Sequence, residues 1–434
     1  MASVSTAYIS ASTNRHSHAA DAKDSLVAFG SSTYVALWNS ADTCGRGTYA
    51  TLPGHEGLVT CVHFVSNDSF VSTDDRGVLK FWREIGTQWV NTVTVSAHSA
   101  AISTLAVCGD VLVTGASDSF VKIWKLTCKP EQDELIESQS ISLKGKFPLA
   151  LQLATLPRSQ VLILAVGGTD RNVNIWTCSE DVFVPSITLP GHEDWVKSLA
   201  FKTLDSEDLS LTLASGSQDG TIRLWKIDPY QRQATQQSTI DALSDDLLDT
   251  FEESLGELAD AEEGGRQISL KRHILTVKDN EGTQKQYTVT FDALLIGHEA
   301  GVTSLSWRPR SSTYSEPTLL STSADSSLIL WSPSTILGST QDGSTSLWIN
   351  RHRFGDIGGQ RLGGFVGGLW AQDGQEALGW GWSGGWRRWQ CSSPQEPATG
   401  TIEDWVEVGA ICGHSAPVKG LAWSPDGDFL ISSR

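Results

Sequence analysis

The strongest constraint on the fold of this chain is a motif of Gly-His, Asp and Trp that recurs along its length. The clearest copy runs from Gly191 to Trp225 and holds three apolar alternating runs, with a turn at Gln218–Asp219–Gly220 before the last one. Alternation with a period of two, broken by Asp-Gly, predicts short antiparallel strands joined by tight turns. A unit of three or four strands cannot bury its apolar faces alone, so copies of it must stack on one another.

Counting the copies predicts the architecture. Further Gly-His or Ala-His pairs begin at Gly54, Ala97, Gly297 and Gly413. The units end on Trp38, Trp82, Trp124, Trp176, Trp225, Trp331 and Trp389. These Trp residues are separated by 44, 42, 52, 49, 106 and 58 residues, and only the 106 departs strongly from the length of one blade. Seven units before Gly413 predict an all-β protein, a seven-bladed β-propeller with four strands per blade.

The Asp of the turn keeps a fixed place in the best copies, six residues before the Trp: Asp118, Asp219 and Asp325. Asp170 has the same offset, but its unit lacks the Gly-His pair and has Val166 where Ser or Thr is expected. Ser replaces the Asp in the first and last units, at Ser32 and Ser383. In the second unit the nearest acid, Asp75, is one residue out of frame. We therefore expect the repeat to be complete in three blades.

An insertion at about residues 230–285 explains the long separation after Trp225, and so falls in blade five. Between Asp241 and Gly265 there are ten acidic residues and no Lys or Arg, with Leu and Phe residues near helical spacing. This segment is either a solvated loop, which its composition favours, or an amphipathic helix that docks a partner. The alternating stretches Arg266–Val277 and Gln284–Leu295 then predict a hairpin that returns the chain to the sheet.

Two domains are expected. Residues 1–411 form the propeller with its insertion, and residues 412–434 begin the first blade of a second propeller, which the chain cuts off before its turn Asp and Trp.

The Gly-His, Asp and Trp at these spacings resemble WD repeats. The order of further features resembles the family of subunit 2 of the Elongator complex, a double-propeller protein. These features are LPGHEDWVKSLAF, SGSQDGTIRLW, the acidic insertion, LLIGHEAGVTSLSW and the Gly-rich Phe354–Phe365. The resemblance implies a non-catalytic scaffold that holds a large first subunit and a catalytic third subunit, which modifies the wobble uridine of tRNAs. It implies no cofactor on this chain.

Three units bring a His, a Ser or Thr and an Asp together, and two interpretations are open. A hydrolase triad would use Asp to orient His and His to activate the hydroxyl. The WD family instead implies a structural tetrad in which the Trp indole also bonds the hydroxyl. Three copies, each with a Trp, favour the structural tetrad: His98, Thr114, Asp118 and Trp124; His192, Ser215, Asp219 and Trp225; His298, Ser321, Asp325 and Trp331.

One basic and aromatic cluster is a candidate contact with RNA or an acidic partner. It combines Trp386 and Trp389 with Arg351, Arg353, Arg361, Arg387 and Arg388. The alternative is that these arginines are outward-facing positions of ordinary strands.

Charge and composition narrow the function. The chain carries a net charge of −18, which opposes general affinity for nucleic acid, so we expect weak or no binding of tRNA by this chain alone. No apolar run is long enough to span a membrane, and seven Cys without a C-x-x-C motif indicate reduced thiols. We expect a cytoplasmic protein and leave a nuclear pool open.

The predicted function is thus an interaction platform, with the Elongator scaffold as the specific form. Another WD-repeat adaptor, such as a ubiquitin-ligase receptor, is the alternative in the same class. A propeller enzyme is the rival in another class, and no acid pair or metal-ligand arrangement in the sequence points to one.

Overall fold

The computed structural model describes residues 11–42, 47–128, 133–203, 209–230, 272–278, 283–310, 316–334, 347–355, 364–391, 403–411, 420–423 and 430–433. Arg361, the acidic segment Asp241–Gly265 and the Gly413–His414 pair lie outside these residues. In the part that is described, no helix is both long and apolar enough to cross a membrane.

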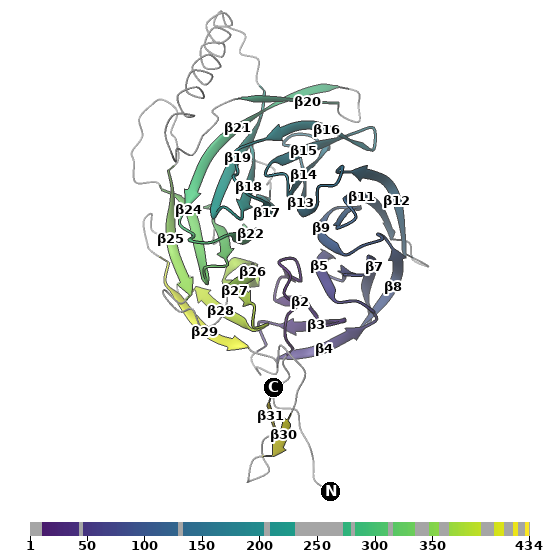
Figure 1. Ribbon diagram of the computed structural model, residues 1–434, viewed down its shortest axis with the longest axis vertical. Helices are drawn as coiled ribbons and strands as arrows, with labels where there is room; N and C mark the ends of the chain where they lie inside the picture. Colours follow the sequence, from purple (N-terminus) through teal and green to yellow (C-terminus); the bar gives the residue numbers. More distant parts are fainter. Residues whose placement is uncertain are drawn as a thin grey trace, which may run out of the picture.

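Seven antiparallel sheets are arranged as blades around a central axis, which confirms the predicted seven-bladed β-propeller (Figure 1). Blades one to three consist of β1 (Ala20–Lys23), β2 (Leu26–Ser31), β3 (Tyr34–Asn39), β4 (Thr48–Pro53); β5 (Val59–Ser66), β6 (Ser69–Asp74), β7 (Val78–Ile85), β8 (Gln88–Ser96); and β9 (Ile102–Cys108), β10 (Val111–Ala116), β11 (Phe120–Cys128), β12 (Asp133–Ser142). Blade four consists of β13 (Pro148–Thr155), β14 (Leu162–Gly168), β15 (Val173–Ser179) and β16 (Val182–Leu189).

Blade five has a fifth strand. Its sheet order is β17-β18-β19-β21-β20, from β17 (Val196–Phe201), β18 (Leu211–Ser217), β19 (Thr221–Pro229), β20 (His273–Lys278) and β21 (Gln284–Ile296). The hairpin predicted after the insertion is therefore present, and its second arm is the fourth strand of the blade. Part of the stretch assigned to the insertion, from residue 273 onward, belongs to the sheet because β20 pairs with β21 from His273 to Lys278.

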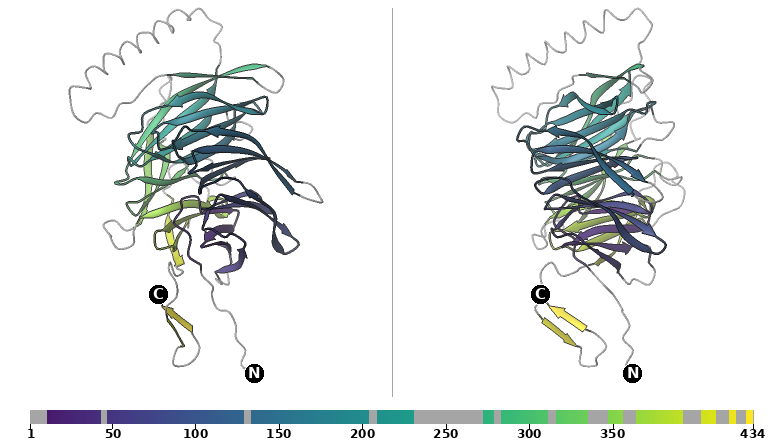
Figure 2. Two further views of the ribbon diagram at one scale, coloured as in Figure 1. Left: turned by 45° about the vertical axis from the view of Figure 1, so that its right-hand side comes forward. Right: turned by 90° about the vertical axis from the view of Figure 1, so that its right-hand side faces the viewer.

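Blades six and seven complete the ring. They consist of β22 (Val302–Trp307), β23 (Leu319–Ser323), β24 (Ser327–Ser334), β25 (Leu347–Gly355); and β26 (Phe365–Ala371), the 3-10 turn η1 (Gln372–Gly374), β27 (Glu376–Gly381), β28 (Trp386–Cys391), β29 (Trp405–Ile411). Beyond them, β30 (Gly420–Trp423) and β31 (Leu430–Ser433) pair with each other and with no blade (Figure 2). That residues 412–434 begin a second propeller stays a prediction.

The hydrophobic core is divided among the seams between blades. Each of the seven buried clusters found in the described residues draws its members from two neighbouring blades. The cluster between blades one and two, for example, joins Leu37 and Val35 to Phe70 and Trp82. A blade is thus stable because it covers the faces of its two neighbours, as expected of a repeat that cannot fold alone.

Blades one and seven are each built from consecutive strands, so the ring closes without a strand exchanged between its ends. Closure depends on side chains and on residues that precede β1. Thr13 N donates to Gly384 O at 2.9 Å, and Trp380 Nε1 donates to His16 O at 3.3 Å. The buried cluster at this seam includes Phe29 of blade one and Trp386 of blade seven, with ring centroids 5.6 Å apart.

Candidate functional site

The predicted His, hydroxyl, Asp and Trp of blade three meet in one hydrogen-bonded group. His98 precedes β9, Thr114 is on β10, Asp118 is in the following turn and Trp124 is on β11. Trp124 Nε1 donates to Thr114 Oγ1 at 2.9 Å, and that oxygen is 2.8 Å from His98 Nε2. His98 Nδ1 is 3.0 Å from Asp118 Oδ2. The four side chains form a continuous chain from the indole to the carboxylate.

Blade five has the same group. His192 Nε2 is 2.9 Å from Ser215 Oγ, and His192 Nδ1 is 3.2 Å from Asp219 Oδ2. Trp225 Nε1 donates to the same Ser215 oxygen at 3.3 Å. Asp219 Oδ1 also accepts from the Thr221 hydroxyl at 2.6 Å, which ties the turn to the start of β19.

Blade six repeats the arrangement, with shorter bonds to the hydroxyl than in blade five. Ser321 Oγ is 2.7 Å from His298 Nε2 and accepts from Trp331 Nε1 at 2.8 Å. His298 Nδ1 is 3.2 Å from Asp325 Oδ2.

A fourth tetrad, in blade two, was missed in the sequence. His55 Nε2 is 2.6 Å from Ser72 Oγ, Trp82 Nε1 donates to that oxygen at 2.8 Å, and His55 Nδ1 is 3.0 Å from Asp74 Oδ2. Asp74 is eight residues before the Trp instead of six, so the fixed offset hides it, while Asp75 caps the backbone N–H of Leu58. The usable signal was the hydroxyl, because Ser72 lies ten residues before Trp82, as in the other three tetrads.

The electrostatics favour a neutral His98 in blade three and ionised turn Asp residues in blades five and six. Burial lowers the pKa of His98, an effect that exceeds the opposing influence of Asp118. Burial also acts to raise the pKa of Asp219, but the hydrogen bonds from His192 and Thr221 outweigh it and hold that pKa well below its usual range. The same balance, through His298 and Ser327, holds the pKa of Asp325 well below its usual range.

These groups are not placed for nucleophilic catalysis. The hydroxyl residues Ser72, Thr114, Ser215 and Ser321 are each 0% exposed. Each hydroxyl oxygen also accepts the indole N–H, so a substrate carbonyl has neither a path to it nor room beside it. The geometry therefore fits structural cross-links that join the loop before a blade to its second and third strands.

The predicted basic and aromatic cluster is not assembled as one surface. Trp386 and Trp389 are buried, at 1% and 4% exposure. Arg388 faces the seam between blades seven and one, where its Nε is 2.5 Å from Glu376 Oε1 and its Nη2 donates to Ser40 O at 2.8 Å. Arg387 precedes it on β28 and also has a partner.

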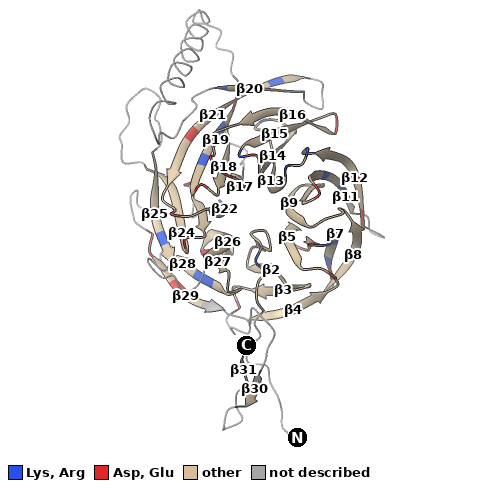
Figure 3. Ribbon diagram, in the orientation of Figure 1, with Lys and Arg blue, Asp and Glu red and all other residues tan. Residues whose placement is uncertain are grey.

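The other two described arginines of that prediction are on blade six. Arg351 Nε donates to Ser332 Oγ at 2.7 Å, and Arg353 Nη1 donates to Gly297 O at 3.2 Å. Lys and Arg residues are spread over several blades instead of gathering on one (Figure 3). A shared basic patch is absent from the described residues of these strands, and Arg361 lies outside them.

Four of the segments matched by a protein-family model coincide with the blades that contain complete tetrads. The family model for the WD40 domain, the G-beta repeat, matches residues 47–83, 89–125, 183–226, 289–332 and 405–434. The first four segments each end one residue after the Trp of a complete tetrad, namely Trp82, Trp124, Trp225 and Trp331. A solved structure titled "Crystal Structure of Mitotic Checkpoint Complex" contains a chain with a TM-score of 0.55 and 16% identity, covering 89% of this chain and 90% of that one. It supports the fold.

Curated relatives named Elongator complex protein 2 match almost the whole chain. The Saccharomyces cerevisiae protein is 30% identical over 94% of this chain and 48% of its own length. The Drosophila melanogaster protein is 28% identical over 98% and 50%, and the Homo sapiens protein 28% identical over 94% and 45%. The chain spans about half the length of these relatives.

Proposed function

We propose that this WD-repeat β-propeller, similar to Elongator complex protein 2 over nearly its whole length, is a subunit of an Elongator complex and serves there as a scaffold. The observation that carries the proposal is the extent of that similarity, which covers 94% or more of the chain in relatives from yeast, fly and human. It therefore runs through all seven blades, including blade four, where the repeat is weakest.

The scaffold role is supported by the chemistry of the blades. The four His and hydroxyl groups are used up in internal hydrogen bonds, with hydroxyl residues at 0% exposure. Among the described residues there is no cluster of three or more His, Cys, Asp or Glu that could hold a metal ion. What the ring offers instead is a rigid body whose exposed loops present side chains to several partners at once.

The specific role follows from the family. We expect this chain to hold the large first subunit and the catalytic third subunit of the complex, and thereby to support modification of the wobble uridine of tRNAs. With a net charge of −18, the chain contributes little tRNA affinity of its own, and we place it in the cytoplasm with a nuclear pool left open.

Tandem-affinity purification with mass spectrometry tests the assignment. A tagged chain should recover the first and third Elongator subunits in stoichiometric amounts. Recovery of ubiquitin-ligase components without any Elongator subunit would reject it in favour of another WD-repeat adaptor.

A further inference from the structure

Blade four keeps the Trp and Asp of the tetrad but replaces the other two members. Trp176 lies ten residues after Val166 and six after Asp170, the same spacing that a tetrad Trp has from its hydroxyl and its Asp. Val166 therefore stands at the hydroxyl position of β14 and offers the indole no oxygen.

Lys144 occupies the backbone position of the tetrad His. In blade three, Ala97 immediately precedes His98. Its N–H donates to the carbonyl of Gly77, in the turn of blade two, at 2.9 Å. In blade four, Leu143 N donates to Ser119 O, in the corresponding turn of blade three, at 2.9 Å. The next residue, Lys144, has a φ of 54°, a left-handed conformation that a Lys rarely adopts and that often marks a functional position.

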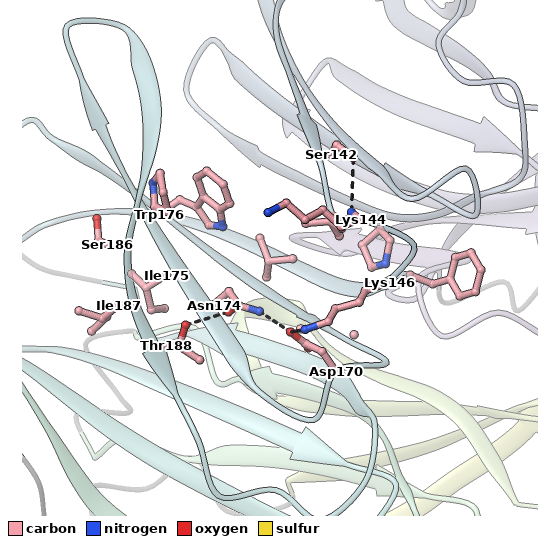
Figure 4. Close-up of a pocket in the computed structure, with 17 residues that line it drawn as sticks. Ser142, Lys144, Lys146, Asp170, Asn174, Ile175, Trp176, Ser186, Ile187 and Thr188 are labelled. Atoms are coloured by element: carbon pink, nitrogen blue, oxygen red, sulfur yellow. Dashed lines mark hydrogen bonds and ion pairs between the residues drawn. The ribbon is translucent and has the colours of Figure 1, made fainter.

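A hollow of about 340 Å³ lies where the imidazole would otherwise fill the space (Figure 4). Its wall includes Trp176, Val166 and Pro148, and Lys144 extends across it toward the Trp176 ring while Lys146 reaches Asp170. This volume is at the lower end of the range for binding sites of small ligands, and it suits one inserted side chain.

Two hydrogen-bond donors in the hollow have no partner among the described residues. The indole N–H of Trp176 makes no hydrogen bond there, whereas the four tetrad Trp residues each donate to a hydroxyl. The ammonium of Lys144 forms no ion pair with a described residue. An indole N–H and an ammonium beside the same space match the two oxygens of one carboxylate.

Asp170, the carboxylate already in the wall of the hollow, does not accept a hydrogen bond from either of these donors. Asp170 Oδ2 accepts from Asn174 Nδ2 at 2.8 Å and is 3.4 Å from Lys146 Nζ. Its charge is thus balanced by Lys146, and Lys144 remains as the uncompensated charge at the site.

Exposed aromatic side chains flank the hollow. Phe147 lines it and is 44% exposed. Phe120, which is 38% exposed, is the register partner of Ser142, another residue of the wall. Apolar groups of this size beside a cation fit a peptide in which an acidic residue is flanked by apolar ones.

We infer that this hollow, between blades three and four, is a docking site for an acidic side chain, Glu or Asp flanked by apolar residues, on a loop of a partner protein. The carboxylate accepts the Trp176 indole N–H and pairs with Lys144. The flanking residues pack on Phe147 and Phe120. The inference does not depend on the assignment to Elongator, because it rests on the donors of this chain alone.

The test selects peptides that bind the immobilised 434-residue chain from a displayed library of random 12-residue peptides. The affinities of synthetic versions of the enriched peptides are then measured by fluorescence polarisation. Enriched peptides should share an acid between apolar residues, and changing that acid to its amide should weaken binding about tenfold. Trp176→Phe and Lys144→Glu should each lower affinity by about the same factor. Lys125→Glu makes the same charge change at an exposed position of β11 in blade three and should leave affinity unchanged.

Melting curves separate a binding role from a structural one. Trp176→Phe should melt close to wild type, because its N–H has no internal acceptor to lose, whereas Trp225→Phe breaks a buried bond. The inference is overturned if the selection enriches no peptide whose binding depends on Lys144 or Trp176. It is also overturned if the acid and amide forms of an enriched peptide bind with equal affinity. If a Lys144→Glu chain still recovers the Elongator subunits normally, the docking site is not one of the contacts that hold those subunits. Neither the peptide-binding result nor the assignment to Elongator changes in that case.

Discussion

At the scale of single residues, the tetrad hydroxyl has two hydrogen-bonding roles. In blade three, Thr114 Oγ1 accepts the Trp124 indole N–H, so its own proton is free to be donated to His98 Nε2. Nε2 can accept only in the tautomer with the proton on Nδ1, and Nδ1 faces Asp118. Each group thus fixes the protonation state of the next, and loss of any one leaves a buried polar atom without a partner.

We predict that breaking a tetrad lowers stability. His192→Ala, Asp219→Ala and Trp225→Phe should each reduce the free energy of unfolding by about 1–3 kcal/mol, because each leaves a buried donor or acceptor unsatisfied. Thermal melting of the three variants checks this. Melting temperatures equal to wild type in all three would contradict the structural role.

His18 gives the stability a predictable dependence on pH. Burial lowers the pKa of His18 to about 4, and its Nε2 is 3.3 Å from Leu149 O in blade four. Between the ordinary His pKa of 6.5 and that value, the unfolded chain binds more protons than the folded one, so stability falls as the pH falls. Below about pH 4, the low pKa values of Asp219 and Asp325 add a further loss as these carboxylates become protonated.

The prediction is a fall in melting temperature from pH 6.5 to pH 4 that is smaller in His18→Gln, since Gln can still donate to the Leu149 carbonyl and does not titrate. Differential scanning calorimetry across this range measures both slopes. An unchanged slope in the variant would show that His18 is not the group that titrates.

At the scale of elements, the blade boundary is the unit of stability. The seam that closes the ring contains a buried charged pair: Glu376 on β27 is 1% exposed and pairs with Arg388 on β28. The Arg388 guanidinium also lies 4.9 Å from the ring centroid of Trp38 in blade one. One side chain therefore neutralises a buried carboxylate and joins the first blade to the last.

Removing this arginine should weaken closure. Arg388→Ala leaves Glu376 buried without its charged partner, and the expected loss in the free energy of unfolding is about 3–5 kcal/mol. Arg76→Ala is the matched control, because Arg76 pairs with Glu56 at 3.0 Å but both side chains are largely exposed, and it should cost about 0–1 kcal/mol. Equal effects of the two changes in denaturant unfolding would refute the proposed role of the seam.

The repeat explains how much of the fold could be predicted. The spacing of Trp residues predicts seven blades because a strand must present its Trp at one register. The period-two alternation located β21 within one residue, since the predicted stretch Gln284–Leu295 is the strand Gln284–Ile296. The His55 tetrad was missed because a shifted turn lets Asp74 reach the imidazole from a different offset. The partners of the candidate arginines could not be predicted, because β25 and β28 belong to different blades and alternation within a strand does not reveal how two blades pack.

Blade four illustrates a further limit. The sequence identifies it as the unit that departs most from the repeat, through Val166 and the missing Gly-His pair. It does not reveal that Lys144 takes the place of the His or that a hollow remains, because both depend on the packing of two neighbouring blades.

At the scale of the whole molecule, charge and surface argue against an RNA-binding role for the isolated chain. The net charge is −18, and Arg351, Arg353 and Arg388 bond to carboxylates, hydroxyls or carbonyls within the ring. The excess of 50 acidic over 32 basic residues opposes contact with a phosphate backbone.

Filter binding of the purified chain to tRNA should accordingly show weak retention at physiological salt. Tight retention that falls steeply as salt rises would contradict this prediction and would restore the RNA-contact interpretation for Arg351, Arg353 and Arg387.

Nucleoside mass spectrometry of tRNA tests the central claim most directly, in cells from which the gene for this chain has been deleted. If the chain is a scaffold of Elongator, the wobble-uridine side chain should be lost on deletion. Both the wild-type chain and a Ser215→Ala chain, expressed at a temperature where the variant is folded, should restore it. Wobble uridines that remain fully modified in the deletion strain would contradict the assignment to Elongator.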